Sequence, residues 1–178
     1  KLSGMKGTNK VLDLFECDGI MILSPSHTHL DYLLQILEGY DGMVLCEKPL
    51  ATDTNSLEII KSMSFDRLMF SFPLRYSLMP ALQTVLKAWV RIKSIDVVVS
   101  HGYAFKPEYL NSWRSDVMKQ PLGPLEAASI HHIDWLAQMF GYPIETTSRV
   151  TNISRNGSAP DTAHTVMLHP PRKQFEYF

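Results

Sequence analysis

The first 73 residues alternate short apolar runs with amphipathic segments. The apolar runs contain no regular polar positions, which is typical of strands that helices cover on both faces. The predicted elements are a central strand over residues 19–23, a helix over 31–38, a strand over 43–46, a helix over 54–63 and a strand over 68–72. The buried stripe of the first helix is expected to consist of Leu30, Leu33, Leu34 and Leu37. Alternating strands and helices with short connections predict a right-handed, parallel, doubly wound sheet.

The pattern changes after Pro73, where strands and helices no longer alternate. Residues 103–124 contain three prolines and no clear period, which is typical of a functional loop; we expect it to expose Tyr103, Phe105, Tyr109, Trp113 and Arg114. The remaining predicted elements are a helix over 77–89, a strand over 95–100, a helix over 125–140 and two strands over 145–154 and 161–169. We therefore expect two domains, residues 1–73 and residues 74–178, of which the second is α+β.

Two of the predicted strands end in polar motifs. The first is followed by Ser-Pro-Ser-His-Thr-His at residues 24–29, and the second by Glu-Lys-Pro at residues 47–49. In an open parallel sheet, ligands bind where the strands end at their carboxyl edge. The two motifs are therefore expected to form neighbouring parts of one ligand crevice.

Composition narrows the classes of partner. The chain has 178 residues and a formal net charge of -1 with scattered charges, so we expect neither a nucleic acid nor a membrane as partner. No apolar stretch approaches the roughly 20 residues of a membrane span, and residues 1–4 do not resemble a signal peptide, so we expect a cytoplasmic protein. The spacing of Cys17 and Cys46 fits neither a zinc motif nor a disulfide framework, and both are predicted to be buried free thiols.

The order and spacing of five short motifs resemble the glucose-fructose oxidoreductase, inositol dehydrogenase and MocA-like (Gfo/Idh/MocA) family. The motifs are residues 24–29, residues 47–50, Arg-Tyr-Ser at 75–77, Trp-Arg at 113–114 and His-His-Ile-Asp at 131–134, and the resemblance covers roughly residues 8–170. It implies a partial Rossmann-type doubly wound parallel sheet followed by an α+β domain with a mostly antiparallel sheet. It also implies an enzyme that uses NAD or NADP, acts on a sugar, sugar derivative or cyclitol, and forms a dimer or tetramer of identical subunits.

The resemblance assigns cofactor-binding roles to residues at the strand ends. Ser24 and Pro25 would lie beside the nicotinamide and its ribose, and His29 would begin the next helix on the cofactor side. Glu47 would contact the ribose or neighbouring backbone. Lys48 would lie beside the cofactor and point at the substrate hydroxyl, and the following proline, Pro49, resembles one that is often preceded by a cis bond.

The resemblance also implies the residues that carry the chemistry. His131 matches the catalytic histidine, and Arg75, Tyr76, Trp113 and Arg114 match positions near the substrate. Oxidation of an alcohol needs a base near the oxygen and a cation that stabilises developing negative charge. His131 and Lys48 suit these two roles because histidine titrates near neutral pH and lysine carries a positive charge. His132 is expected to point elsewhere.

The sequence departs from the family pattern at two places. Many members carry an aspartate four residues before the histidine, where this chain has Ala127; Glu126 lies five residues before His131 and would be rotated off that face of an ideal α-helix. No Gly-rich turn follows a first strand, and we expect the cofactor domain to be incomplete at its N-terminus. These departures favour, as an alternative, a non-catalytic relative that serves as a sensor or scaffold. A metal site built from His27, His29, His131 or His132 is a further alternative that no spacing supports.

Overall fold

The computed structural model describes residues 8, 10–64, 66–77, 81, 84, 92–100 and 102–170. The chain divides into two compact units, Lys1–Ser71 and Phe72–Phe178, and each is described by itself. Most of the helix predicted over residues 77–89 lies outside the described residues.

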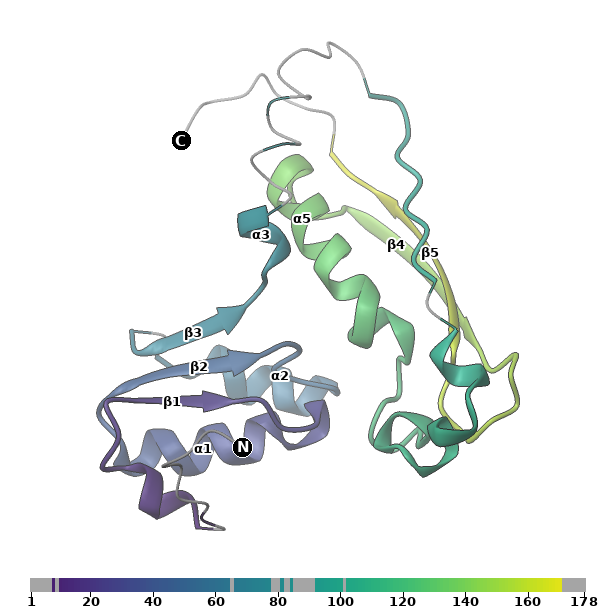
Figure 1. Ribbon diagram of the computed structural model, residues 1–178. Helices are drawn as coiled ribbons and strands as arrows, with labels where there is room; N and C mark the ends of the chain where they lie inside the picture. Colours follow the sequence, from purple (N-terminus) through teal and green to yellow (C-terminus); the bar gives the residue numbers. More distant parts are fainter. Residues whose placement is uncertain are drawn as a thin grey trace. The chain divides into compact units, whose positions relative to one another are not determined.

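The first unit is a three-stranded parallel sheet with helices between its strands (Figure 1). Its elements are η1 (Val11–Leu14), β1 (Gly19–Ile22), η2 (Ser26–Thr28), α1 (His29–Gly39), β2 (Met43–Glu47), α2 (Thr54–Lys61) and β3 (Leu68–Ser71). The strands lie in the order β1-β2-β3, and the register pairs Ile22 with Cys46 and Cys46 with Phe70. The predicted alternation of strands and helices is confirmed.

The core of the first unit lies on one face of this sheet. Ile20, Ile22, Val44 and Cys46 point to that face and pack against Leu33 and Ile36 of α1. The buried stripe of α1 differs from the predicted one, because Ile36 belongs to it whereas Leu34 is 40% exposed. A helix residue is buried when it lies on the face that packs against the sheet. The positions of the leucines alone did not identify that face of α1.

The opposite face of the sheet carries exposed methionines. Met21, Met43 and Met69 are each about half exposed or more. The prediction of a central first strand, covered on both faces, is wrong for the described residues: β1 is an edge strand that pairs only with β2. An unbroken apolar run is compatible with a strand buried on both faces. Whether both faces are buried depends on the elements that pack against the strand.

The second unit combines short helices with a two-stranded antiparallel sheet. Its described elements are α3 (Leu74–Ser77), η3 (Tyr103–Phe105), η4 (Pro107–Asn111), η5 (Trp113–Ser115), η6 (Leu125–Ser129), α5 (Ile130–Phe140), β4 (Glu145–Thr151) and β5 (Thr162–Leu168). The register pairs Glu145 with Leu168 at one end and Thr151 with Thr162 at the other. The two predicted strands are therefore confirmed, and so is the α+β class of this part of the chain.

Two predicted elements of the second unit need correction. Residues 95–100 form no strand, although they are rich in valine, because they pair with no other strand of the described residues. The helix predicted over residues 125–140 begins as a π-helix, η6, and becomes α-helical only at Ile130. A strand needs a partner and a π turn depends on local packing, so neither feature is visible in side-chain periodicity.

The segment 103–124 is anchored to the connection between β4 and β5. The carbonyl of Ser115 accepts hydrogen bonds from the backbone N–H groups of Ser158 at 2.7 Å and Ala159 at 2.9 Å. Gly157 lies against the same residue with a φ of 80°, and a Cβ at this position would approach the Ser115 carbonyl oxygen to 2.4 Å. Only glycine satisfies both the positive φ and this close approach.

The two cysteines lie in different environments. Cys46 is fully buried in the core of the first unit, and burial raises the pKa of its thiol to about 12. Cys17 is exposed, so the prediction that both thiols are buried is wrong for Cys17, which follows η1 instead of lying inside a strand. Within the part of the chain that the structure describes, no helix has the length and apolar character needed to cross a membrane.

Candidate functional site

The first candidate region, which we call the strand-end region, comprises residues 24–29 and 47–49. The parallel pairing of Ile22 with Cys46 places the turn after β1 beside the turn after β2. Ser24, Pro25, Glu47 and Lys48 are partly buried there. The structure thus brings together all five residues predicted to bind a cofactor, with His29 as the fifth.

Hydrogen bonds within the strand-end region hold its two turns. The Thr28 hydroxyl donates a hydrogen bond to the Pro25 carbonyl and forms a second one with the Ser24 hydroxyl, each at 2.7 Å. The backbone N–H of Lys48 donates to the Glu47 carboxylate at 3.3 Å, which is the contact with neighbouring backbone expected of this side chain. The Lys48–Pro49 peptide bond is cis.

His29 lies between the two turns of the strand-end region. Its ring is 1% exposed, Nδ1 lies 2.7 Å from the Pro49 carbonyl oxygen, and Nε2 lies 2.8 Å from the Ser24 carbonyl oxygen. The ring therefore faces two backbone groups of the chain itself instead of an open surface. Periodicity placed His29 only at the start of a helix; its two carbonyl partners became visible in the folded turns.

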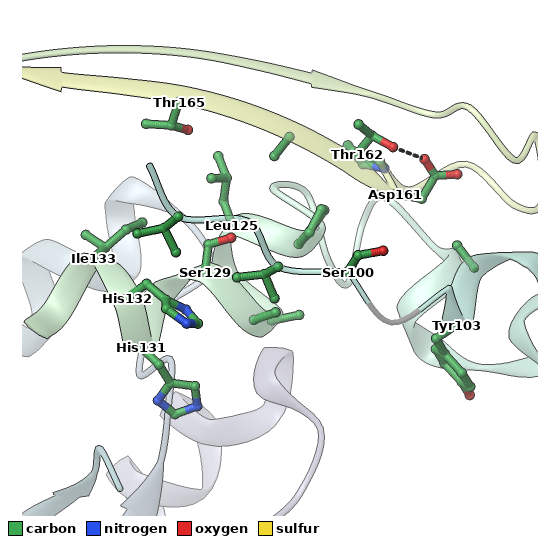
Figure 2. A pocket seen from close by; sticks show the side chains of 18 of the residues that line it. Ser100, Tyr103, Leu125, Ser129, His131, His132, Ile133, Asp161, Thr162 and Thr165 are labelled. Carbon is green, nitrogen blue, oxygen red and sulfur yellow. Dashed lines mark hydrogen bonds between the residues drawn. The ribbon is translucent and has the colours of Figure 1, made fainter. Parts of the chain in front are cut away.

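The second candidate region is a pocket of about 870 Å³ inside the second unit. One side is formed by the start of the η6–α5 helix and another by β5, as Figure 2 shows. Residues of segment 103–124 also line it, so the long loop borders a pocket as the sequence indicated. Polar residues around the pocket include Tyr103, Arg114, Ser129, His132, Asp161 and Thr165.

His131 and His132 both line this pocket. The ring of Phe72 contacts the His131 ring edge-on, with centroids 6.1 Å apart. The two rings point in different directions in Figure 2, although both residues border the pocket. Within the described residues, the buried Nδ1 of His132 has no hydrogen-bond partner.

Asp134 binds Arg75, which was expected near the substrate. The carboxylate accepts hydrogen bonds from Nε at 2.7 Å and from Nη2 at 2.5 Å. This bond raises the pKa of Arg75 above its ordinary value, while burial opposes the shift. The guanidinium also lies over the Phe72 ring, with Cζ 4.9 Å from the centroid, so Arg75 joins α3 to α5.

The other predicted substrate residues differ in their surroundings. Arg114 lines the pocket, and its Cζ lies 4.3 Å from the centroid of the Trp113 ring. Tyr76 is 78% exposed. Tyr109, expected to be exposed, is 4% exposed and donates a hydrogen bond to the Arg114 carbonyl at 2.7 Å; burial raises the pKa of its hydroxyl. Of the four predicted substrate residues outside α5, the structure therefore brings only Arg114 to the pocket of the second unit.

The π turn changes the assessment of Glu126. A π turn has i to i+5 hydrogen bonds, so residues five apart lie closer to one another around the helix than they do in an α-helix. Glu126 lies in η6, is 4% exposed, and precedes His131 by five residues. The predicted rotation of Glu126 off the histidine face applies to an ideal α-helix, whereas this segment is a π-helix. The run Glu-Ala-Ala-Ser before His131 did not by itself indicate a π turn.

The parallel strands and their polar ends define the first unit as part of a Rossmann-type nucleotide-binding domain. Residues 3–64 match the family model described as oxidoreductase family, NAD-binding Rossmann fold, of the Gfo/Idh/MocA group. This match agrees with the family predicted from the motifs. No curated protein matches the sequence.

Solved structures with the same fold cover both units. Levoglucosan dehydrogenase in complex with NADH and levoglucosan is 18% identical, with a TM-score of 0.70 over 90% of this chain and 47% of that one. The WlbA dehydrogenase from Bordetella pertussis, in complex with NADH and UDP-GlcNAcA, is 18% identical, with a TM-score of 0.70 over 89% of this chain and 50% of that one. An oxidoreductase from Agrobacterium radiobacter, in complex with NAD+, L-tartaric acid and magnesium, is 16% identical, with a TM-score of 0.65 over 90% and 48%. The chain therefore spans about half the length of the solved structures that it matches.

Proposed function

We propose that this chain is the reacting part of an NAD(P)-dependent oxidoreductase that transfers a hydride between the nicotinamide and a CH–OH group of a sugar, sugar derivative or cyclitol. The observation that carries the proposal is the strand-end region: two adjacent polar turns at the carboxyl edge of a parallel sheet, in a segment that matches an NAD-binding family. The complexes of two structural neighbours with NADH and a sugar compound support the same class of reaction.

The strand-end region fits the nicotinamide half of a dinucleotide. Ser24 and Glu47 offer hydroxyl and carboxylate oxygens to ribose hydroxyls, and both side chains are partly buried instead of fully solvated. Pro25 would border the nicotinamide ring, and Lys48 would lie beside the reacting carbon. A bound nicotinamide supplies the hydride acceptor for alcohol oxidation, or the hydride donor for the reverse reaction.

Two side chains would handle the proton and the charge. His131 would take the proton of the substrate hydroxyl as the hydride leaves, and would return it in the reverse direction. Lys48 would donate a hydrogen bond to the same oxygen and stabilise the negative charge that develops on it. His131 lines a pocket large enough for a sugar ring, with Arg114 as a donor of several hydrogen bonds for hydroxyl or carboxylate groups.

Glu126 would take the role of the aspartate that many family members carry at the position of Ala127. Its carboxylate is buried in the π turn that precedes His131, where a negative charge would favour the imidazolium form of the histidine. In an ideal α-helix, Glu126 would not lie on the same face as His131, so this role depends on the π turn.

Titration of the protein with NADH and NADPH tests the proposal directly. Quenching of Trp113 and Trp135 fluorescence, with heat of binding measured by calorimetry, is expected for at least one cofactor. A subsequent screen of sugars, uronic acids and cyclitols with the preferred cofactor would reveal turnover as a change in nicotinamide absorbance. If neither cofactor binds in either assay, the oxidoreductase proposal fails.

Ala127 supports a second candidate, a non-catalytic relative that binds a dinucleotide or sugar as a sensor or serves as a scaffold. Cofactor binding without turnover of any screened substrate would favour it. Replacement of both Lys48 and His131 would then leave the biological role intact, whereas an enzyme would lose it. For either candidate, a cytoplasmic location and an assembly of identical subunits remain part of the proposal, which sedimentation and cell fractionation would check.

A further inference from the structure

His29 joins the two turns of the strand-end region through a single buried ring. Nδ1 lies 2.7 Å from the Pro49 carbonyl oxygen and Nε2 lies 2.8 Å from the Ser24 carbonyl oxygen. Both distances are typical of N–H···O hydrogen bonds. Because these two carbonyls belong to residues at the ends of β1 and β2, one side chain spans the carboxyl edge of the sheet.

The chemistry of the partners restricts the protonation of the ring. A carbonyl oxygen only accepts hydrogen bonds, and a neutral imidazole has one N–H donor and one nitrogen lone pair. A neutral ring would therefore direct its lone pair at one of the two carbonyl oxygens, within 2.8 Å. Only the imidazolium form donates to both, and such charge-assisted hydrogen bonds are stronger than neutral ones.

We propose that His29 is a positioning residue that, as an imidazolium, clamps the Ser24 turn to the Pro49 turn and thereby fixes Lys48 for the reaction. Lys48 immediately precedes Pro49, so the carbonyl that His29 holds lies one residue from the backbone of the reacting lysine. The effect on Lys48 rests on the proposed function, whereas the clamp between the two turns does not. It replaces the expected contact between His29 and a cofactor.

The surroundings of the ring are consistent with a rigid clamp. His29 and Leu33 are both almost completely buried, and Cys46 at the end of β2 is fully buried. The charged groups of the adjoining elements are Asp31 in the first turn of α1 and Glu47 and Lys48 at the end of β2, with His27 in the preceding turn. Because burial, Lys48 and the N-terminus of α1 all disfavour a charged ring, the proposed clamp depends on the two carbonyl contacts.

Nitrogen NMR of the unmutated protein tests the clamp without any need for activity. In a nitrogen-labelled sample near neutral pH, both ring nitrogens of His29 are expected to carry protons, and both N–H signals are expected to exchange slowly with water. His29→Asn identifies the signals by their loss. A lone-pair nitrogen in the His29 ring would overturn the proposal, because the ring could then hold only one turn.

Kinetics test whether the clamp positions Lys48. His29→Asn is expected to lower kcat about 10- to 100-fold, as a small misplacement of a reacting group does, with little change in the KM of the substrate. Leu33→Ala, in the same helix, is the matched control: it weakens the core but breaks neither carbonyl contact, so its kcat below the unfolding transition should match that of the unmutated protein. Equal kcat values for His29→Asn and Leu33→Ala would contradict the positioning role. If the protein turns over no substrate, the proposed function fails while the NMR result still decides the clamp.

Discussion

The strand-end region and the pocket of the second unit are built in different ways. In the strand-end region, residues 24–29 and 47–49 come from two turns of one parallel sheet, and the contacts of the His29 ring at 2.7 and 2.8 Å tie the two turns together. The pocket is lined by residues between Pro73 and Met167, from a helix, a strand, the segment 92–100 and three short 3-10 helices. A site made from neighbouring strand ends follows from the strand order, whereas a site made from many segments depends on how they pack.

The same contrast appears in the polar groups of the two regions. His29 has a carbonyl partner at each ring nitrogen, while the pocket holds a buried His132 nitrogen that has no hydrogen-bond partner among the described residues. Satisfied groups hold a fixed geometry, and an unsatisfied donor or acceptor in a pocket is a contact that a ligand can complete. This contrast supports the proposed roles, cofactor binding for the first region and substrate binding for the second.

The strongest test of this division replaces one reacting residue in each region. Lys48→Met and His131→Asn are each expected to lower turnover by about 100- to 10,000-fold, because each removes a group that stabilises charge or transfers a proton. The double variant is expected to lose less than the product of the two effects, because the proposed function gives both residues a role in the same chemical step. Steady-state kinetics with the preferred cofactor provide the measurement.

The matched control for that test is His164→Asn, on the exposed part of β5. Turnover should be unchanged. Full activity in either Lys48→Met or His131→Asn would show that the corresponding region does not take part in the reaction.

Glu126→Gln tests the role of the π turn and is expected to have a smaller effect on turnover than Lys48→Met or His131→Asn. The proposed role of the Glu126 carboxylate beside His131 predicts a turnover lower by up to about 100-fold and a shift in the pH at which activity falls, because a neighbouring negative charge favours a protonated histidine. Glu108→Gln is the control, because Glu108 is exposed on η4. A pH–rate profile identical to that of the unmutated protein would show that Glu126 has only a packing role.

Gly157→Ala tests how the connection between β4 and β5 holds the segment 103–124. The positive φ and the 2.4 Å approach to the Ser115 carbonyl oxygen should together lower the free energy of unfolding by about 2–5 kcal/mol. Gly102→Ala separates the two causes, because Gly102 also has a positive φ, 62°, but nothing lies within 4 Å of its added Cβ; a loss of about 1 kcal/mol is expected there. Urea unfolding measures both, and equal losses would mean that the contact with Ser115 contributes nothing.

Asp161→Asn should have a smaller effect than Gly157→Ala, and that effect should depend on pH. Burial raises the pKa of Asp161, but hydrogen bonds from Ser154, the Ile153 backbone and Thr162 outweigh it and hold the pKa below its ordinary value. A depressed pKa stabilises the folded state above the ordinary aspartate range, and this contribution is lost as the pH falls through the lower folded value. The variant should lose about 1–3 kcal/mol near neutral pH and progressively less in acid.

The control for this measurement is Glu145→Gln, exposed on β4. Its unfolding free energy should remain close to that of the unmutated protein at neutral and acidic pH. A loss in Asp161→Asn that stays constant from neutral pH to strong acid would contradict the assigned role of the carboxylate charge.

Most elements of the fold could be predicted from local patterns. The three parallel strands, α1, α2, β4 and β5 all lie where apolar runs or helical spacing indicated them. The failures have a common cause in contacts between distant residues: residues 95–100 lack a pairing strand, Leu34 is exposed, and so is Cys17. The division of labour between residues 1–73 and 74–178 stays a prediction.

The sequence predicted the strand-end region more completely than the pocket of the second unit. The five strand-end residues are adjacent, as their motifs implied, because parallel pairing of two consecutive strands leaves little freedom in where their ends lie. In the second unit, His131 and Arg114 line the pocket as expected near a substrate, but His132 and Glu126 required the actual helix geometry. Arg75 pairs with Asp134, and no spacing between residues 59 positions apart indicates such a pair.

The sequence by itself determined the alternation of strands and helices, the polar ends of β1 and β2, and the family of residues 3–64, because each of these is written in local periodicity or in short motifs. Only the tertiary structure decided which faces are buried, that the histidine helix begins with a π turn, and that His29 binds two carbonyls. Hydrogen bonds and burial depend on partners that are distant in the chain. A pattern can place a side chain on an element, but the packed neighbours decide what it does there.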